Sequence, residues 1–371
     1  MSRRHATDLL VSTTPTSSWE LRDIAVTLGR TVKATPVFDT YWRFAARRQQ
    51  LFMRRLAGSP PPWTDDPVLR AYRFTNAYRA ADRVSQYLIR HVLYDSDQSP
   101  AEIFFRAILF KLFNRVETWK ALSAEFGTPT AATFQPDRYA QLLDDLLARD
   151  LRVYSAAYIV PCPRLGYERK HTNHLHLLHR MLRDEAPGRI ADARSLETVY
   201  TILKGYSSIG PFLAFQFAID LNYSALLDFS EMDFVVAGPG ARDGIRRCFA
   251  DTGGLDDADL IRAVSDLRED EFARLGLDFP DLWSRPLQLI DLQNLFCEVD
   301  KYARAVHPAS PGASARTRIK RKYSPSDRPL PQWYPPKWRL NVPRFLAGHQ
   351  APPPGHRPAP VPVNQPIPRP A

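Results

Sequence analysis

The chain has 371 residues, of which 50 are Lys or Arg and 40 are Asp or Glu, which gives a net charge of +10. Its 44% hydrophobic content is enough for one large folded domain, and it excludes a chain disordered throughout, a collagen and a disulfide scaffold. No apolar run approaches the roughly 20 residues of a membrane-spanning helix, and the first 18 residues lack the apolar core of a signal peptide. We therefore expect a soluble intracellular protein that does not bind membranes, cytoplasmic or nucleoid-associated, or nuclear if the host is eukaryotic.

Helical periodicity dominates the chain after a Ser- and Thr-rich start, residues 1–18, that we expect to be disordered. The one segment with strand-like composition is 151–160, and it has no evident partner. The fold class that follows is mainly α, with a single large helical domain over residues 19–315. The expected helices are about 37–57, 69–93, 101–122, 136–149, 171–183, 195–204, 210–222, 241–250, 257–275 and 286–305.

Two of these helices carry polar side chains among apolar ones. In the helix over 69–93 these residues are Asn76, Arg79, Asp82 and Arg83, of which the first, second and fourth are spaced to share one face. In the helix over 101–122 they are Asn114 and Glu117. Because buried Asn and Glu are costly without partners, we expect the two helices to face each other across a polar site. The alternative is a structural ion pair from Arg79 or Arg83 to Glu117.

Residues 203–214 predict a helix end, a tight hairpin and a new helix start. Free amides at such a hairpin can hold a DNA phosphate, which makes Lys204, Gly205, Ser208 and Gly210 candidate DNA contacts. The segment resembles the helix-hairpin-helix of DNA glycosylases, although Ser208 stands where that pattern has a glycine. An ordinary helix-turn-helix corner is the alternative. Glycines cluster between 205 and 244, which predicts a close approach of the backbone to another group.

Asp233 follows Gly210 by 23 residues, about the spacing at which the glycosylase superfamily places a catalytic aspartate. Its apolar neighbours predict desolvation and a raised pKa, which would suit a proton acceptor. The helix that follows offers Arg242 and Arg246 as phosphate contacts. Alternatively, Asp233 only caps the turn before that helix.

Two further groups of residues have both a chemical and a structural explanation. Lys301 in the helix over 286–305 is a candidate nucleophile or substrate contact, but an ion pair with Glu298 explains it equally. The histidines at 171, 174, 176 and 179 invite a metal site, yet they point to different faces of a helix. We predict no metal and no cofactor. Three widely spaced cysteines favour reduced thiols.

The positive charge belongs to the end of the chain, because residues 316–371 carry 11 Lys or Arg and one acid while residues 1–315 balance to zero. Basic residues at 316–345, among them Arg318, Lys320 and Lys322, alternate with Tyr and Trp, a pattern suited to phosphate contact and base stacking. We expect this extension to pack on or flank the domain. Residues 346–371, rich in proline, predict a disordered tail.

Several blocks occur together in an order that resembles one family. They are FDTYWRFAARRQ (38–49), RFTNAYRAADRVSQYLIR (73–90), FKLFNRVETW (110–119), GPGARDG (238–244), DLQNLFCEVDKYAR (291–304) and RTRIKRKY (316–323). They look like the helical domain associated with 5-hydroxymethyluracil DNA kinases, which belongs with the α-glutamyl/putrescinyl thymine pyrophosphorylase group of DNA base hypermodification proteins. The matching polar positions are Asn76, Arg79, Asp82, Arg83, Asn114, Glu117, Asp220, Asp233, Arg242 and Lys301.

The resemblance implies work on a thymine-derived base in DNA. In such pathways a P-loop kinase phosphorylates 5-hydroxymethyluracil, and a helical-domain protein displaces the phosphate with an amino acid or polyamine. The chain has no G-x-x-x-x-G-K-[ST] sequence, so we expect a transferase that depends on a separate P-loop DNA kinase or base oxygenase.

On this hypothesis the base is flipped out of the stack, and the site residues divide into two groups. Catalysis is assigned to Asp233, Glu117, Asp220, Asn114 and Lys301. Substrate and phosphate binding is assigned to Asn76, Arg79, Asp82, Arg83, Arg242 and Arg246. Two alternatives remain: a glycosylase that removes the modified base with Asp233, and a non-catalytic DNA-binding module that recruits a partner through the Pro-rich tail.

Overall fold

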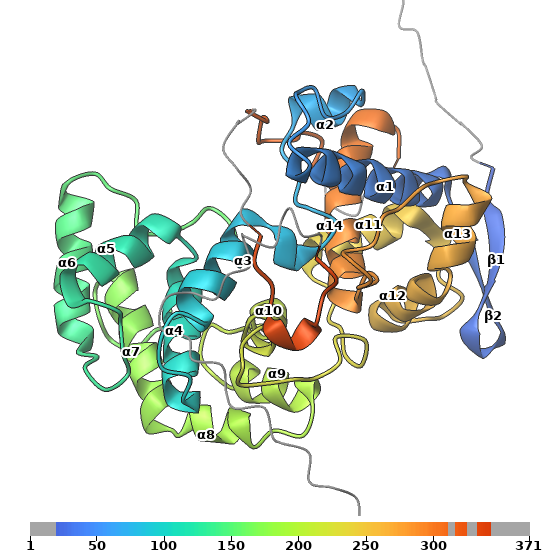
Figure 1. Cartoon of the computed structure of the whole chain (residues 1–371). Coiled ribbons are helices and arrows are strands. Elements are labelled where there is room, and N and C mark those ends of the chain that lie inside the picture. Colours follow the sequence, from blue (N-terminus) through green and yellow to red (C-terminus); the bar gives the residue numbers. More distant parts are fainter. Residues whose placement is uncertain (1–19, 311–315, 325–331, 343–371) are drawn as a thin grey trace, which may run out of the picture.

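The computed structural model describes residues 20–310, 316–324 and 332–342, and within them the fold is mainly α, as predicted. Helices fill both halves of the molecule in Figure 1. The helices of the first half are α1 (Pro36–Leu56), α2 (Pro67–Ala71), α3 (Arg83–Leu88), α4 (Pro100–Phe113), α5 (Val116–Phe126), α6 (Pro136–Ala148) and α7 (Lys170–Arg183). Those of the second half are α8 (Ala186–Ala191), α9 (Leu196–Lys204), α10 (Pro211–Asn222), α11 (Pro239–Cys248), α12 (Asp257–Asp266), α13 (Arg268–Arg274) and α14 (Leu289–Val306).

Helices α4 to α8 form one side of the molecule, and α1 and α11 to α14 form the other. Between the two groups lie α3 and α10 (Figure 1). Helix α10 is buried along almost its whole length and packs against both α9 and α4. One continuous cluster of buried hydrophobic side chains runs through both sides. The polar residues of α10 are therefore enclosed where the two groups of helices meet.

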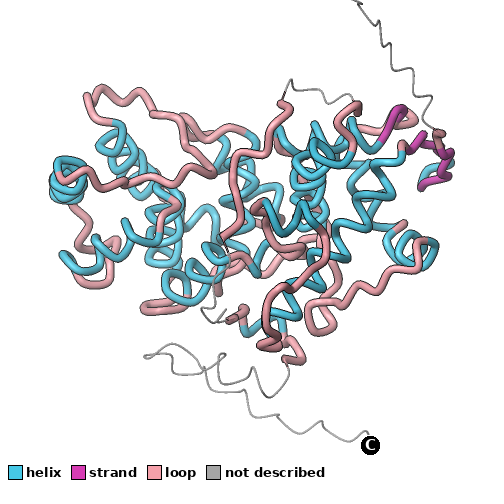
Figure 2. The backbone as a smooth tube through the Cα atoms, turned by 90° about the horizontal axis from the view of Figure 1, so that it is seen from above, coloured by secondary structure: helices cyan, strands magenta, loops and turns pink. Residues whose placement is uncertain are grey.

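A small antiparallel sheet lies at one edge of the molecule (Figure 2). Strands β1 (Arg22–Val26) and β2 (Arg30–Ala34) form a hairpin, and β3 (Phe249–Asp251) pairs with β2. These strands were not predicted, because short strands with mostly exposed residues carry a weak hydrophobic pattern. The prediction of 151–160 as the strand-like segment was wrong. That segment is irregular, with Val153 and Val160 buried but Leu151 and Ile159 exposed.

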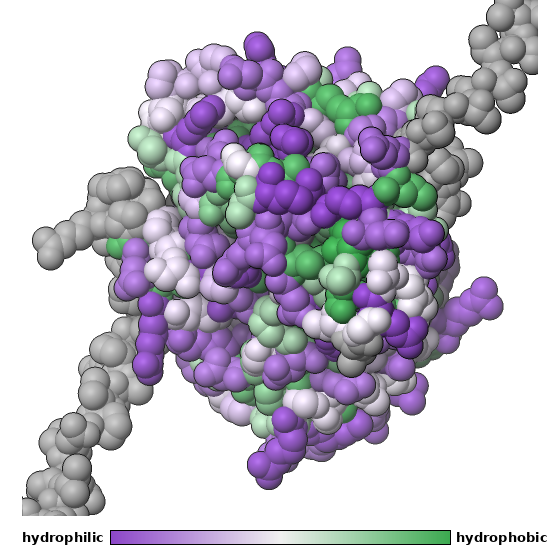
Figure 3. Space-filling view, turned by 90° about the vertical axis from the view of Figure 1, so that its right-hand side faces the viewer, coloured by the Kyte–Doolittle hydropathy of each residue, from purple (hydrophilic) through white to green (hydrophobic). Residues whose placement is uncertain are grey.

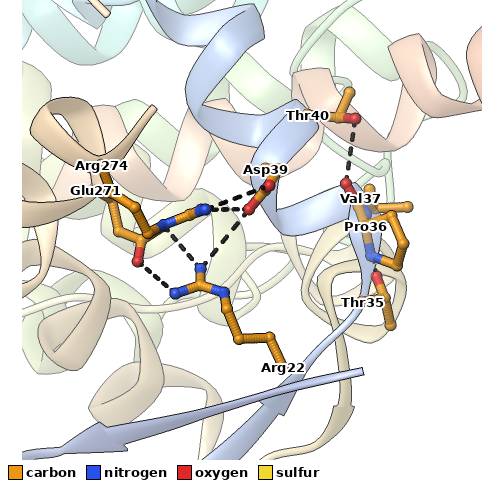
Figure 4. A network of polar contacts seen from close by, with 8 residues as sticks. All are labelled: Arg22, Thr35, Pro36, Val37, Asp39, Thr40, Glu271 and Arg274. Carbon is orange, nitrogen blue, oxygen red and sulfur yellow. Dashed lines mark hydrogen bonds and ion pairs between the residues drawn. The ribbon is translucent and has the colours of Figure 1, made fainter. Parts of the chain in front are cut away.

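An ion-pair network attaches the sheet to the helices, as Figure 4 shows. Arg22 of β1 donates two hydrogen bonds of 2.9 and 2.8 Å to the carboxylate of Glu271 on α13. Arg274 contacts both Glu271 and Asp39 of α1. Glu271 is buried, whereas the other three side chains are about one-third exposed, so the network positions these elements more than it stabilises them. This end of the molecule has a mostly hydrophilic surface (Figure 3).

Two expected helices are broken in the structure. The segment 69–93 forms α2, a loop, a 3-10 turn η2 (Arg79–Ala81), α3 and a π-helical turn η3 (Ile89–Leu93). The segment 101–122 is divided at Asn114, whose backbone adopts the left-handed conformation with φ of 49° and ends α4. Each break changes which side chains share a face. The spacing arguments made across these two segments therefore fail.

The predicted close approach of the glycine-rich backbone is confirmed, and the groups approached are side and main chains of the protein itself. A Cβ atom at Gly238 would lie 2.6 Å from the ring of Phe212, and one at Gly244 would collide with the carbonyl of Phe296. The absence of a side chain at Gly244 allows α11 to pack closely against α14. Gly238 in turn fixes the ring of Phe212 at the start of α10.

The extension after residue 315 packs on the body of the protein. The amide of Tyr323 donates to the carbonyl of Ala71, and the amide of Arg73 donates to that of Arg321. Trp333 and Tyr334 are buried, at 3% exposure each. The expectation that these two aromatic rings stack on bases is wrong, because they complete the hydrophobic core instead. The predicted disorder of residues 1–18 and 346–371 lies outside the described residues.

Among the helices of the described ranges, none is both long enough and apolar enough to cross a membrane.

Candidate functional site

A buried ion cluster lies between α4 and α10. The carboxylate of Asp220 on α10 is 2.8 Å from a guanidinium nitrogen of Arg79 and 3.1 Å from the ammonium nitrogen of Lys111 on α4. The side chains of all three are at most 4% exposed. We call Arg79, Lys111 and Asp220, with Asn114, the inner cluster. The two predicted polar helices meet here through Asp220, since η2 carries Arg79 and α4 carries Lys111.

Neighbouring side chains hold each member of the inner cluster in place. The Nε of Arg79 donates to the side-chain oxygen of Gln216 over 2.9 Å, and the backbone amide of Arg79 donates to Asp291 over 2.7 Å. Lys111 donates to the side-chain oxygen of Asn114 over 3.0 Å. Burial lowers the pKa of the Lys111 ammonium, and the Asp220 carboxylate opposes this shift. An amine in this position is closer to its neutral, nucleophilic form than a surface lysine.

Lys111 was not among the predicted site residues. The signal in the sequence was a lysine in the middle of the apolar run AILFKLF, where an unpaired ammonium would be costly. Such a lysine requires an acidic partner. The partner, Asp220, lies more than 100 residues away, so the pairing could be found only from the fold.

A second polar group lies nearer the surface and is called the outer cluster: Asp82, Asn76, Arg48, Glu298 and Lys301. The Asp82 carboxylate accepts the backbone amide of Asn76 over 2.9 Å, and the Asn76 side chain accepts from Arg48. Burial raises the pKa of Asp82 to about 6, although the Asn76 amide and the Arg48 guanidinium act to lower it. The carboxyl group of Asp82 can therefore exchange a proton near neutral pH.

Glu298 and Lys301 complete the outer cluster from α14. They form an ion pair, as the structural alternative predicted, and Glu298 also accepts the backbone amide of Thr75 over 3.0 Å. Glu298 is buried, while the Lys301 side chain remains 30% exposed. The ammonium of Lys301 thus combines a fixed position with access to solvent.

An exposed row of cations leads to the outer cluster. Residues 321–323 run alongside 71–73, so the exposed cations Arg73, Arg321 and Lys322 lie close together along this chain pair. We call this group the basic strip: Arg70, Arg73, Arg318, Lys320, Arg321 and Lys322. Thr75, two residues beyond Arg73, contacts Glu298. The basic strip and the outer cluster are therefore continuous along one segment of chain.

Glu117 and Arg83 were predicted site residues and belong to neither cluster. Glu117 is on α5, its side chain 57% exposed, and it pairs with Arg115 at 3.4 Å. Glu117 therefore does not form the proposed ion pair with Arg79 or Arg83. The helix breaks at Asn114, and this turns Glu117 away from the inner cluster that contains Arg79 and Lys111. Arg83 begins α3 and is exposed. It does not share a face with Asn76 and Arg79, since these three residues do not belong to one helix.

Asp233 and the arginines after it lie on the surface. Asp233 is exposed in the loop between α10 and α11, so the expected desolvation of its carboxylate is wrong. Arg242 pairs with Asp257 of α12 at 3.1 Å, and Arg246 is exposed. Their assigned roles remain predictions.

A turn joins α9 to α10 in the segment for which a helix-hairpin-helix was predicted. Ser208 has φ of 65°, the left-handed conformation that a glycine would adopt at lower cost. Gly210 precedes the first residue of α10, and Lys204 and Gly205 end α9. This geometry is compatible with phosphate binding, which remains a prediction for these four residues.

The histidines of α7 have structural partners. His171 lies 3.2 Å from Asp144, and His174 contacts the hydroxyl of Tyr154 and the carbonyl of Pro161. Burial lowers the pKa of His174 to about 4. Within the described residues, no group of three or more His, Cys, Asp or Glu side chains is placed to hold a metal ion. The three cysteines are free thiols.

The described residues thus form a helical protein with an enclosed ion cluster, a second cluster around a titratable carboxylate, and a basic strip. The family model described as "5-hmdU DNA kinase, helical domain" matches residues 35–312, and the chain belongs to this family. It is also 28% identical over 288 residues to the 5-hmdU DNA kinase of Bacillus phage SP10. That match covers 72% of this chain but only 45% of the phage protein. No solved structure matches the chain.

Proposed function

We propose that the protein modifies a 5-substituted uracil in DNA by replacing a phosphate-activated 5-substituent with an amino acid or polyamine. The family relationship supports involvement in thymine hypermodification, since the phage relative is a 5-hmdU DNA kinase. The observation that carries the proposal is the continuity of the basic strip with the outer cluster, which joins a surface for phosphates to a titratable carboxylate.

In the proposed reaction the amine nitrogen attacks the methylene carbon attached to C5 of the base. A carbon–nitrogen bond forms, the carbon–oxygen bond to phosphate breaks, and phosphate leaves with the electron pair. The attacking amine loses one proton, for which Asp82, with a pKa near 6, is a suitable acceptor. The exposed cation of Lys301 and those of the basic strip are suited to the leaving phosphate.

This assignment changes the roles expected from the sequence. Asp220 is enclosed by two cations, so we propose that it organises the inner cluster rather than accepting a proton. Arg79 is engaged with Asp220 and Gln216 and is not available to the phosphate. Asp233, exposed beyond α10, remains a second candidate base. The proposal needs a source of phosphate, and a separate P-loop DNA kinase is the partner it implies.

The proposal is tested by incubating the full chain with DNA that contains 5-phosphomethyluracil and a pool of amino acids and polyamines. Digestion to nucleosides and mass spectrometry should reveal a new nucleoside, and Asp82→Asn should reduce its yield strongly. The same digest measures release of free base, which would indicate a glycosylase. If the protein binds the DNA but neither product forms, the proposed enzymatic function is wrong, and a non-catalytic DNA-binding module remains.

A further inference from the structure

We propose that the ring of Tyr158 occupies the position of a pyrimidine base flipped out of DNA, that Arg79 and Asp220 recognise the edge of that base, and that Lys111 lies over its face. This inference rests on the proposed function and names how its substrate would be bound. It concerns a residue that neither the sequence analysis nor the outer cluster uses.

Tyr158 lies beside an aromatic ring and a cation. Its ring stacks on that of Phe212 with centroids 5.8 Å apart and an angle of 5° between the planes. The ammonium nitrogen of Lys111 lies 4.6 Å from the centre of the same ring. A stacked aromatic ring and a nearby cation are the groups with which proteins commonly hold a base. The ring of Phe212 itself packs closely against Gly238.

Charged groups of both clusters act on the hydroxyl of Tyr158. Burial raises the pKa of this hydroxyl, Arg79 lowers it, and Asp82 and Asp220 raise it further. A base in the place of the Tyr158 ring would therefore feel the charges of the inner cluster and of the carboxylate that we propose as the proton acceptor.

The segment that carries Tyr158 is attached at both ends but weakly at its tip. On one side the amide of Ser155 donates to the carbonyl of Phe113 over 2.9 Å, and on the other His174 contacts the carbonyl of Pro161. Between these anchors the Asn114 side chain donates to Ala157 over a long 3.4 Å, and Ile159 is 63% exposed.

Tyr158 itself has φ of 54°, a left-handed conformation that costs free energy in a tyrosine. The weak attachment of the tip and the strained backbone of Tyr158 would allow the ring to swing out, while the contacts at Ser155 and Pro161 stay in place.

Arg79 and Asp220 match the edge of uracil. Arg79 is a donor beside the Asp220 acceptor. Uracil and thymine present the complementary pair, in which the O4 acceptor lies beside the N3–H donor. In the same orientation cytosine has a donor at C4 and an acceptor at N3, so it would place like groups against Arg79 and Asp220. The arrangement predicts recognition of thymine-type bases over cytosine.

Photo-crosslinking tests the proposed base position. A single-stranded oligonucleotide with one 5-iodouracil is irradiated with the full chain, and the attachment site is mapped by mass spectrometry. We expect attachment at Phe212 or Tyr158, and about tenfold less attachment when 5-iodocytosine replaces 5-iodouracil. Attachment only at other residues, or equal yields for the two bases, would overturn the proposal.

Variants distinguish a base site from a packed core. Tyr158→Ala removes the ring that competes with the base, so the yield at Phe212 should rise several-fold relative to Tyr158→Phe, which keeps the ring. If the ring has only a packing role, Tyr158→Ala should lower the yield. Crosslinking of the unaltered chain provides the result if Tyr158→Ala does not fold.

The two proposals can fail separately. Attachment at Phe212 without any new nucleoside would leave the base site standing and contradict the transfer reaction. A new nucleoside with attachment elsewhere would contradict the base site alone.

Discussion

The ammonium nitrogen of Lys111 lies 3.1 Å from a carboxylate oxygen of Asp220, although the residues belong to helices α4 and α10 and both side chains are almost fully buried. Since Asp220 also pairs with Arg79, one carboxylate neutralises two cations from two other parts of the chain. Because one carboxylate faces two cations, Arg79 and Lys111 both depend on Asp220 for their counter-charge.

We therefore predict that Asp220→Asn lowers the free energy of unfolding by about 3–5 kcal/mol, because it leaves two buried cations without a counter-charge. Lys111→Met should cost clearly less, since Asp220 keeps Arg79 as its partner. Urea denaturation followed by circular dichroism measures both values. Equal losses for the two variants would contradict the central place of Asp220.

The raised pKa of Asp82 predicts a pH dependence of the proposed reaction. If Asp82 accepts the proton of the attacking amine, the rate should rise with pH through about 6 as the carboxyl group ionises. Asp82→Asn should remove this limb of the profile and not only lower the rate. An unchanged profile in Asp82→Asn would assign the proton transfer to another group, with Asp233→Asn as the matched comparison.

The raised pKa of Asp82 also makes the stability of the protein depend on pH. The carboxyl group of Asp82 titrates near 6 in the folded protein and near 3.8 in the unfolded chain, so the folded state holds the extra proton between these values. The contribution of Asp82 to stability should therefore fall as the pH rises from about 4 to about 6. Comparing urea unfolding of the unaltered chain and Asp82→Asn across this window isolates that contribution.

The basic strip predicts how DNA binding depends on salt. Replacing Arg318, Lys320 and Lys322 by serine should lower the slope of log K against log salt by up to about 2.7, if each cation contacts one phosphate of duplex DNA. Fluorescence anisotropy at several salt concentrations measures this slope. Arg149 and Arg183, exposed on another part of the surface, provide a matched control whose replacement should leave the slope unchanged.

Lys337 predicts a stability effect at the end of α10. Its ammonium donates to the carbonyls of Asn222, Ser224 and Leu227 at the end of α10, and burial lowers its pKa to about 8. Lys337→Met would leave these carbonyls without that donor and should cost about 1–3 kcal/mol. Thermal unfolding measures the loss. Lys320→Met, at an exposed position, should have little effect.

The sequence predicted the positions of several helices well, but it did not predict the turns that interrupt two of them. The 3.6-residue period located α1, α6, α7 and α14 to within about three residues at each end, because their apolar faces are buried along the whole length. The left-handed turn at Asn114 left no comparable mark, since Asn is tolerated both within a helix and at its end. This single turn accounts for the misplaced Glu117.

Some members of the two clusters were named from the sequence. They are Asn76, Arg79, Asp82, Asn114, Asp220 and Lys301, and their roles remain predictions. Asp233, which was predicted to be desolvated, lies on the surface. Lys111 was missed because the pairing between α4 and α10 depends on distant contacts that no local pattern contains. The aromatic residues of the extension were misread for the same reason. The sequence around Trp333 does not distinguish a ring that stacks on a base from one that fills the core. The fold shows that Trp333 is buried.

The attachment of Lys337 to the end of α10 also has a consequence for how the protein is made. Helix α10 leaves the ribosome more than 100 residues before the lysine that satisfies its last carbonyls. The centre of the molecule cannot reach its final state until synthesis has passed residue 338, so nascent chains should remain open to proteases and chaperones for most of translation.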